Sequence, residues 1–335
     1  MSIKIAINGF GRIGRAACKI ALTHADAEVV AINDLGDIEN LAYLLRYDTV
    51  YGRYGTEVTV EGNELVVGKK RIKVLQSKNP EELPWKAMGI DVVIESTGFF
   101  TEEEGAKKHI TAGAKHVVIS GPTKSENVPT VVMGVNDDKL PGVSVVSNAS
   151  CTTNSAAPVM AVLQSVFGVE KALLTTAHAY TATQSLVDGP GGKGDFRRGR
   201  AAAQNIVPAS TGAAIAATLA IPSLAGKFDG ISLRVPVPVV SISDITCVLS
   251  RDTSVEEVNQ VFKDAVDNPI YQGIIAVTEE PVVSSDFIGD PHSAIIDLPL
   301  TRVVGGNLVK VLAWYDNEWG YSNRLVEQVL AVGNS

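Results

Sequence analysis

The sequence is poor in cysteine. Its 335 residues include only three cysteines, which are too few and too widely spaced for a disulfide scaffold or a thiolate zinc site. We therefore predict no metal centre, and a reducing cytoplasm is the compartment that fits best. Each cysteine remains a candidate either for a small buried side chain or for a reactive thiol.

The sequence also lacks an excess of positive charge and any long apolar run. A formal net charge of −8 argues against a general nucleic-acid or membrane role, although the basic residues 197–200 could bind one anionic ligand. No apolar run reaches a membrane-spanning length, and the first residues show no basic leader or cleavage site. We expect an unprocessed, soluble, cytoplasmic protein.

The hydrophobic content is high enough for a large core. Hydrophobic residues make up 45% of the chain and charged residues only 20%, so disorder is excluded as the main state. A chain of this length is expected to form two domains.

A glycine-rich turn follows the first predicted strand. Residues 3–7 form a short isoleucine-rich run, Gly9, Gly11 and Gly14 follow in the spacing G-x-G-x-x-G, and residues 15–22 favour a helix. In a dinucleotide fold the first glycine permits the turn, the second lets a pyrophosphate approach the backbone and the third allows close helix–strand packing. Taken alone, the pattern is equally compatible with a structural turn.

An acidic residue lies at the expected distance from this turn. Residues 28–32 predict a second buried strand, and Asp34 lies 20 residues beyond Gly14, where a carboxylate can accept hydrogen bonds from the adenosine ribose. The same carboxylate would repel a 2′-phosphate, so NAD is favoured over NADP. The alternative is an ordinary helix or turn cap.

Further strands complete a parallel pattern in the first half of the chain. Residues 91–95 and 116–119 are apolar runs that lead into the small residues around Thr97 and Ser120, as expected where a parallel sheet opens onto its ligand. Residues 57–67 predict a hairpin insertion. The first half therefore predicts a doubly wound α/β fold.

Cys151 has the surroundings of a reactive thiol. It lies among polar residues, and residues 155–167 behind it form an apolar-periodic stretch that predicts a helix. The positive end of that helix favours a thiolate, and its free N–H groups can stabilise an oxyanion. Cys18, in a core-facing helix, and Cys247, in the alternating strand 241–249, have no such flanks and are interpreted as inert.

His178 is the best candidate for a base. A thiolate nucleophile usually needs an imidazole to activate it and to move protons, and His178 ends the apolar run 171–177 and opens a polar segment. The other histidines occur among charged or turn-like residues and are interpreted as surface or capping residues. They are His24, His109, His116 and His292.

Five long motifs, in order along the chain, resemble the glyceraldehyde-3-phosphate dehydrogenase family. They are residues 8–15, 149–154, 178–181, 209–214 and 314–321. The resemblance covers essentially the whole chain. It implies a Rossmann-type doubly wound domain over residues 1–150, joined by a C-terminal helix at about 316–335, and an α+β catalytic domain with a mostly antiparallel sheet over residues 151–315.

The resemblance also implies a reaction, that of a phosphorylating, NAD-dependent enzyme of glycolytic type. Cys151 would attack the aldehyde of D-glyceraldehyde 3-phosphate and His178 would act as base. Hydride would pass to the nicotinamide, and inorganic phosphate would cleave the resulting thioester to give 1,3-bisphosphoglycerate.

The family's binding residues carry over by the same resemblance. The cofactor residues implied are Gly9, Gly11, Arg12, Ile13, Gly14, Asp34, Lys78, Thr97, Ser120 and Asn317. The substrate phosphate is implied at Thr181 and Arg234, and the inorganic phosphate or its path at Ser150, Thr152, Arg198, Thr211 and Gly212. Hydroxyl, N–H and guanidinium groups are what a dianion requires. Taken singly, Arg234 could equally be a surface residue at a strand edge, and Thr181, Thr211, Gly212 and Asn317 turn or cap residues.

Two departures from the family pattern concern the active-site region. Ser155 replaces a second cysteine that many members carry four residues after the nucleophile, so an intrachain disulfide with Cys151 is impossible here. Residues 187–194, in the loop that resembles the family's S-shaped cofactor loop, are unusually glycine-rich, which leaves the NAD preference resting mainly on Asp34. The family is homotetrameric, with the loop at about 180–203 reaching towards a neighbouring subunit's cofactor.

Alternative functions remain open at the level of sequence. Erythrose-4-phosphate dehydrogenase shares the scaffold and the catalytic pair but releases its acid with water. An acyl-phosphate reductase of the aspartate-semialdehyde type would carry different flanking motifs. An NAD-binding interaction protein would be expected to have lost Cys151 or His178. A requirement for phosphate separates the first of these from the family's main activity.

Overall fold

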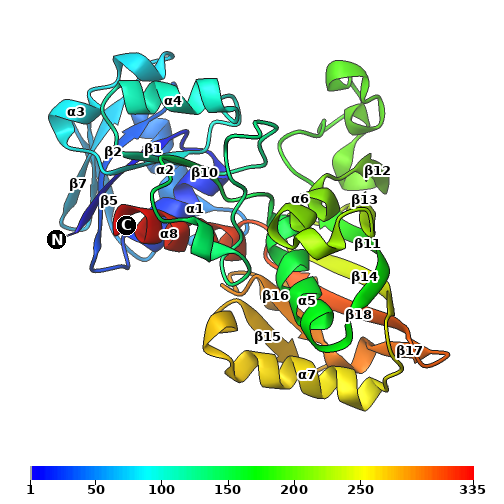
Figure 1. Cartoon of the computed structure of the whole chain (residues 1–335). Helices are drawn as coiled ribbons and strands as arrows, with labels where there is room; N and C mark the ends of the chain where they lie inside the picture. Colours follow the sequence, from blue (N-terminus) through cyan, green and yellow to red (C-terminus); the bar gives the residue numbers. More distant parts are fainter. Residues whose placement is uncertain (1) are drawn as a thin grey trace. The chain divides into compact units, whose positions relative to one another are not determined.

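The chain divides into two compact units, shown in the computed structural model of Figure 1, which describes residues 2–335. Unit 1 contains the residues up to Val131 together with Asp137–Ser150 and Ser322–Ser335, and unit 2 contains Val132–Asn136 and Cys151–Tyr321. Among the described residues, no helix is long and apolar enough to cross a membrane.

Unit 1 is built on a largely parallel sheet. In spatial order its strands are β10 (Val145–Ser147), β9 (His116–Ile119), β8 (Val92–Glu95), β1 (Ile3–Asn8), β2 (Ala27–Asn33), β7 (Lys70–Leu75), β6 (Glu64–Val67) and β5 (Val58–Glu61). The pairs from β10 to β7 are parallel, and β6 and β5 add an antiparallel hairpin. Because the chain order reverses between β1 and β8, this is the doubly wound topology, with its switch point beside β1.

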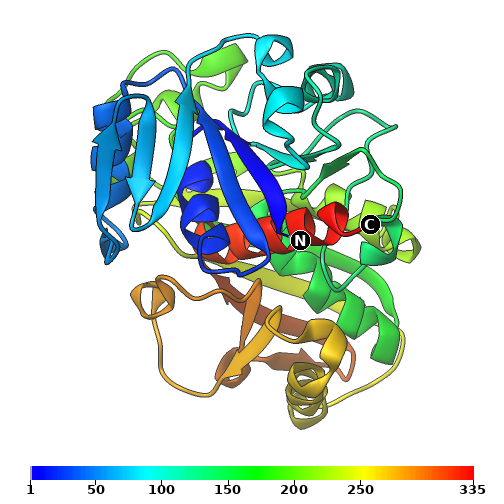
Figure 2. The same cartoon turned by 90° about the vertical axis from the view of Figure 1, so that its left-hand side faces the viewer.

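The helices of unit 1 lie between these strands along the chain, except for the last, which ends the unit. They are α1 (Arg12–Ala21), α2 (Ile38–Arg46), α3 (Trp85–Met88), α4 (Glu103–Thr111) and the C-terminal α8 (Trp319–Gly333), and a short ribbon of β3 (Tyr47–Asp48) and β4 (Gly52–Arg53) follows α2. Figure 2 shows the blue and cyan strands of the sheet with the red α8 running across it. Every residue of β8 is buried, as expected for a central parallel strand covered on both faces.

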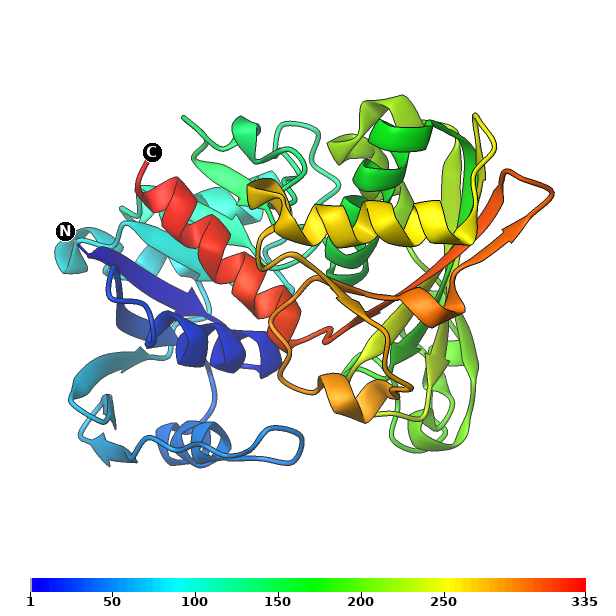
Figure 3. The same ribbon diagram turned by 90° about the horizontal axis from the view of Figure 1, so that it is seen from below.

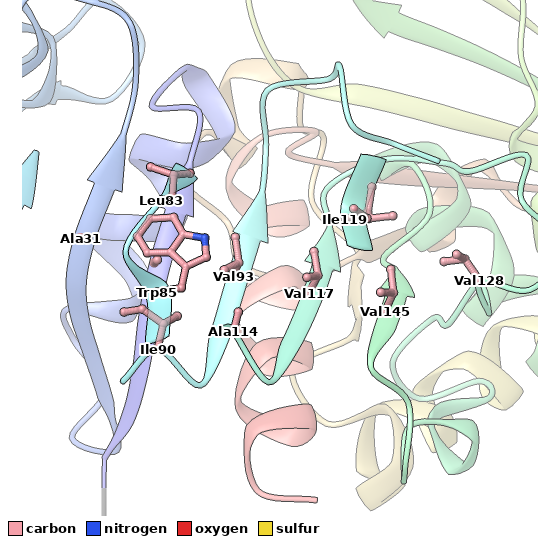
Figure 4. Close-up of a cluster of buried hydrophobic side chains, with 12 residues drawn as sticks. Ala31, Leu83, Trp85, Ile90, Val93, Ala114, Val117, Ile119, Val128 and Val145 are labelled. Atoms are coloured by element: carbon pink, nitrogen blue, oxygen red, sulfur yellow. The ribbon is translucent and has the colours of Figure 1, made fainter. Parts of the chain in front are cut away.

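The core on one face of this sheet gathers around Trp85. Figure 4 shows its indole beside Leu83 and Ile90, with Val93 and Val117 continuing the cluster across neighbouring strands towards Val145. Trp85 is fully buried. Burying aromatic and branched side chains of this size stabilises the layer by about 1.5–3 kcal/mol each relative to exposure.

Two local expectations for unit 1 need correction. The first helix begins at Arg12, earlier than the expected residue 15, because the last glycine of the motif lies inside the helix, not in the turn. A Cβ on Gly14 would lie 2.1 Å from the carbonyl oxygen of Gly9, so only glycine allows this packing. The hairpin is followed by β7, which the sequence analysis missed because its residues alternate with lysine and arginine.

Unit 2 is built on a mixed sheet. In spatial order its strands are β12 (Val207–Ser210), β13 (Phe228–Val235), β11 (Val169–Ala179), β14 (Ser241–Leu249), β18 (Leu308–Tyr315), β16 (Ala294–Asp297) and β15 (Ile275–Thr278), with β17 (Arg302–Val304) also paired to β18. Only β11 with β13 and β15 with β16 are parallel. The predicted fold class, a doubly wound sheet plus a mostly antiparallel one, is confirmed.

One face of this second sheet is covered by helices. They are α5 (Cys151–Phe167), α6 (Ala213–Ala220) and α7 (Val255–Asp267), and Figure 3 shows the yellow α7 crossing in front of the green α5. Alternate residues of β14, from Ser241 to Leu249, are buried beneath them, which is the period expected of a strand with one covered face. The helix α5 begins at Cys151, four residues before the predicted start at 155.

Candidate active site

The start of one helix and the end of one strand in unit 2 bring Cys151 and His178 together. Cys151 is the first residue of α5, and His178 lies near the end of β11. The cysteine Sγ is 3.3 Å from Nε2 of the imidazole, and His178 is only 4% exposed. A thiol at the positive end of a 17-residue helix, in contact with an imidazole nitrogen, has the arrangement of an activated nucleophile.

The second imidazole nitrogen is held by the backbone. Nδ1 of His178 lies 2.7 Å from the carbonyl oxygen of Ala179, and a guanidinium nitrogen of Arg234 approaches the same oxygen at 3.0 Å and Nδ1 itself at 2.6 Å. Nδ1 thus lies between the guanidinium, which only donates, and the carbonyl, which only accepts. We assign the imidazole proton to Nδ1, where it is donated to the carbonyl. That assignment leaves Nε2 free to accept the proton of the thiol.

Burial opposes a lone charge on either partner. Burial raises the pKa of the Cys151 thiol, against the lowering effect of the Arg234 charge and of hydrogen bonds from Thr152. Burial and the neighbouring Arg234 lower the pKa of His178 to about 3, so the imidazole is a neutral acceptor at physiological pH. Moving the proton from Sγ to Nε2 creates no net charge, so burial opposes this transfer less than loss of the proton to solvent.

A buried tyrosine supports the pair and was missed by the sequence analysis. The hydroxyl of Tyr315 is 2.9 Å from Oγ1 of Thr152 and 2.8 Å from Oγ1 of Thr176, and its ring meets the His178 imidazole edge-on at 6.2 Å. The hydroxyl of Thr152 is therefore engaged inside the protein. Tyr315 belongs to the motif 314–321, but nothing in the sequence distinguished it from a core aromatic.

Asn317 is oriented by a serine at a strained turn. The amide N–H of Ala179 donates to Oγ of Ser241 at 3.1 Å, and that hydroxyl donates to Oδ1 of Asn317 at 3.0 Å. Val240, immediately before the serine, has φ of 68°. A β-branched residue in the left-handed region is uncommon and often marks a functional site. The carboxamide nitrogen of Asn317 is thus directed away from Ser241.

The predicted anion residues differ in how they are held. Thr211 accepts the Ala213 N–H at 3.2 Å, and Gly212 forms the N-cap of α6. Arg234 lies on β13 between β12 and β11, so it is not the edge arginine that the alternative interpretation required. Of the rest, Ser150 directly precedes α5, Thr181 bonds to Thr183 and Arg198 pairs with Asp195.

Unit 1 contains a cavity of about 560 Å³ at the switch point of its sheet. Of the predicted cofactor residues it is lined by Gly9, Gly11, Asp34, Lys78 and Thr97, whereas Arg12, Ile13, Gly14 and Ser120 do not line it. The lining residues that the sequence analysis missed are Asn8, Asn33, Leu35, Ser77, Ser96, Phe99 and Phe100. Most of these residues lie at or just after the C-terminal end of a strand, and that position in the sequence could have pointed to them.

The backbone of this cavity requires glycine. Gly9 has φ of 94°, and a Cβ there would lie 2.7 Å from the Thr97 amide nitrogen. Nothing lies within 4 Å of the corresponding position on Gly11, so a ligand can approach it. Asp34 accepts the amide hydrogens of Phe10 at 2.7 Å and of Gly36 at 2.8 Å; it thus holds the turn as a cap and also faces the cavity.

Comparison with known proteins decides the family. The family model described as glyceraldehyde 3-phosphate dehydrogenase, NAD binding domain, matches residues 3–103, and the C-terminal domain model of the same family matches residues 150–317. The chain belongs to the glyceraldehyde-3-phosphate dehydrogenase family. It is 52% identical to the glyceraldehyde-3-phosphate dehydrogenase of Streptomyces coelicolor over 100% of this chain and 99% of the relative. It is 49% identical to glyceraldehyde-3-phosphate dehydrogenase 1 of Bacillus subtilis over 98% of this chain and 97% of that relative.

Membership of the glyceraldehyde-3-phosphate dehydrogenase family confirms two predictions, that the chain is an oxidoreductase and that its cofactor is NAD. The family's NAD-binding model spans every residue that lines the 560 Å³ cavity. The cavity also suits the cofactor chemically, since it combines a carboxylate, a glycine backbone open to a pyrophosphate and a helix N-terminus at α1.

The other cysteines and the serine at 155 fit the inert interpretation. Cys18 and Cys247 are 0% and 1% exposed, and burial raises the pKa of each thiol to about 12. Ser155, where many dehydrogenases of this family carry a second cysteine, is fully buried, and its hydroxyl lies 3.1 Å from that of Ser243. Neither buried thiol is suited to nucleophilic attack.

One histidine prediction was wrong. His109 is fully buried in α4, where the surrounding charged sequence had indicated a surface or capping residue. Lys107 and Lys108 lie on the outer side of the helix, whereas His109 points into the core of unit 1. His24, His116 and His292 are all partly exposed.

Proposed function

We propose that the chain oxidises and phosphorylates D-glyceraldehyde 3-phosphate to 1,3-bisphosphoglycerate, using NAD and inorganic phosphate, with a thiohemiacetal and a thioester on Cys151. The observation that carries this proposal is the 3.3 Å contact between Sγ of Cys151 and Nε2 of His178 at the start of α5. The pair occurs in a chain about half identical to its named relatives over its full length. A glycolytic role in the cytoplasm belongs to the same proposal.

The first half of the reaction forms the thioester. Sγ of Cys151 attacks the aldehyde carbon, and the N–H groups at the start of α5 stabilise the oxygen that becomes negative. Nε2 of His178, which took the thiol proton, returns it to that oxygen to give the thiohemiacetal hydroxyl. The imidazole then takes the hydroxyl proton back while hydride leaves the same carbon, so a proton and a hydride, with its two electrons, depart together. NAD, when bound, supplies the acceptor for this hydride.

The second half releases the product. An oxygen of inorganic phosphate attacks the thioester carbon, the carbon–sulfur bond breaks and the thiolate of Cys151 returns. We propose Arg234 and Thr181 for the substrate phosphate, and Ser150, Thr152, Arg198, Thr211 and Gly212 for the inorganic phosphate or its path. The guanidinium of Arg234, already beside the imidazole, and N–H groups at the start of α6 are groups that bind dianions.

The phosphate requirement tests this function. With purified protein, NAD and glyceraldehyde 3-phosphate, we expect rapid NADH formation that depends on added inorganic phosphate and is slow with NADP. Water is a poor competitor for a site built to position a dianion. Comparable turnover without phosphate, or a preference for erythrose 4-phosphate, would assign the chain to the hydrolytic alternative. A protein that binds NAD without any turnover would support the interaction-protein alternative.

We further propose that the enzyme is a homotetramer. The uncovered face of the unit 2 sheet exposes Leu173 by 66%, Ile231 by 53% and Leu308 by 40%, side chains that a soluble protein normally covers when they gather on one face. The loop at residues 180–203 also exposes Leu186 and Phe196 by about four fifths. Sedimentation equilibrium should give four times the chain mass of 35.3 kDa, and a monomer at micromolar concentration would contradict the assembly.

A further inference from the structure

A hydrogen-bonded cluster of three side chains lies buried beneath the cavity of unit 1. Glu95 ends β8 and is 1% exposed, and His109 of α4 is fully buried beside it. Oε2 of Glu95 lies 3.1 Å from Nε2 of His109, and the indole N–H of Trp85 donates to Nδ1 of His109 at 2.9 Å. None of these three side chains takes part in the reaction proposed above.

The tryptophan sets the tautomer of this histidine. Indole nitrogen can only donate, so Nδ1 of His109 must be the acceptor and carries no proton. The proton of the neutral ring is then on Nε2, which donates it to Glu95. Trp85, near one end of the hydrophobic cluster in Figure 4, therefore fixes the direction of the hydrogen bond that reaches the carboxylate.

Glu95 receives four hydrogen bonds in all. Oε1 accepts the backbone N–H of Thr97 at 2.8 Å and its hydroxyl at 2.5 Å, and Oε2 accepts the side-chain amide of Asn8 at 2.5 Å as well as His109. Every partner is a donor, and every lone-pair direction of the carboxylate is used. A buried carboxylate saturated in this way holds its partners rigidly, because release of any one leaves a buried charge undersatisfied.

The partners of Glu95 form the wall of the cavity. Asn8 and Thr97 both line it, and Oδ1 of Asn8 accepts from Asn33 at 2.7 Å. Asn33 in turn accepts the Ser77 N–H at 2.9 Å, and both residues also line the cavity. One carboxylate therefore orients four lining residues that come from the ends of β1, β2, β7 and β8.

We propose that Glu95 is a positioning residue for cofactor binding, with His109 and Trp85 as its fixed support. It shapes the dinucleotide cavity from beneath without touching the ligand. The inference rests on the proposed use of this cavity by NAD.

Glu95→Gln tests the proposal with little change in volume. A carboxamide replaces one acceptor oxygen by an NH₂ group that can only donate. The two donors that now bond to that oxygen, either the N–H and hydroxyl of Thr97 or the side chains of Asn8 and His109, would lose their acceptor. We expect the dissociation constant for NAD, measured by calorimetry on the full chain, to rise about tenfold, with KM for NAD rising by more than kcat falls. The matched control is Val145→Ala, at the far end of the hydrophobic cluster from Trp85 (Figure 4), which loses core packing but leaves the hydrogen bonds intact.

A second pair of variants separates positioning from bulk stability. His109→Gln keeps a donor for Glu95 and an acceptor for Trp85, whereas His109→Leu removes both. We expect NAD affinity within about twofold of the parent for the first and a several-fold loss for the second. Nitrogen-15 NMR of the parent should show His109 protonated on Nε2 alone.

The outcomes distinguish this proposal from the one on which it rests. If Asp34→Ala leaves NAD affinity unchanged, NAD does not use this cavity and both proposals fall. If Asp34→Ala weakens binding but Glu95→Gln does not, only the positioning role is overturned. The role is also overturned if Val145→Ala, at equal loss of unfolding free energy, weakens NAD binding as much as Glu95→Gln.

Discussion

Replacing Cys151 by serine is expected to lower NADH production from glyceraldehyde 3-phosphate by about 10³-fold or more. A serine hydroxyl in the same place is far less acidic than a thiol, and the buried site already opposes a lone negative charge there. Neither the helix N-terminus nor His178 can offset that difference. Steady-state rates at saturating substrate, with NAD affinity measured in parallel by calorimetry, check the expectation.

The control for this variant is Cys247→Ala, which changes a cysteine of the same unit buried in β14. It should lose some stability through a small cavity and keep turnover within a few-fold of the parent. Full dehydrogenase turnover by the serine variant would rule out the covalent mechanism, and normal NAD affinity together with lost turnover would support it.

Replacing His178 by asparagine is expected to cut turnover by about 10²–10⁴-fold. The asparagine amide nitrogen can keep the hydrogen bond that Nδ1 makes to the Ala179 carbonyl, but nothing then replaces Nε2 as proton acceptor for the thiol. Because the thiolate loses the partner that takes its proton, the pKa of Cys151 should rise further above its already raised value. The rate of alkylation by iodoacetamide, followed against pH, should therefore shift to higher pH.

The sign of that shift separates two roles for the imidazole. A base that accepts the thiol proton favours the thiolate, so its loss moves the alkylation profile upward in pH. An imidazole that merely packs against the thiol would leave the profile in place. His292→Asn, at a partly exposed histidine paired with Asp290 in the same unit, should leave both the profile and turnover unchanged.

Local patterns in the sequence predicted the fold class and the central pair. The strand, glycine turn and acidic residue at Asp34 indicated the dinucleotide fold because each step depends on residues close together in the chain. Cys151 and His178 were found from their polar flanks at the ends of apolar runs, which is where catalytic groups occur on a rigid scaffold. The structure adds that they face each other across 3.3 Å.

Partners that depend on distant strands could not be predicted in this way. Tyr315 reaches Thr152 from 163 positions along the chain, and no periodicity records such a contact. His109 was misjudged because the charged residues around it occupy the exposed side of α4, and its own side faces Trp85 in the core. The charged residues of a helical segment show that some of its faces are exposed, but they do not show which side chains lie on the buried face.

The register of two parallel strands determines which insertions and deletions the active site can tolerate. His178 on β11 and Arg234 on β13 are direct neighbours in the ladder, although 56 positions separate them. The chain between them passes first through the glycine-rich segment 187–194 and then through β12 and α6 before it returns along β13. Insertions or deletions confined to residues 187–194 can alter what the loop recognises while the reacting groups stay in place, so the chemistry can be inherited unchanged as specificity and assembly diverge.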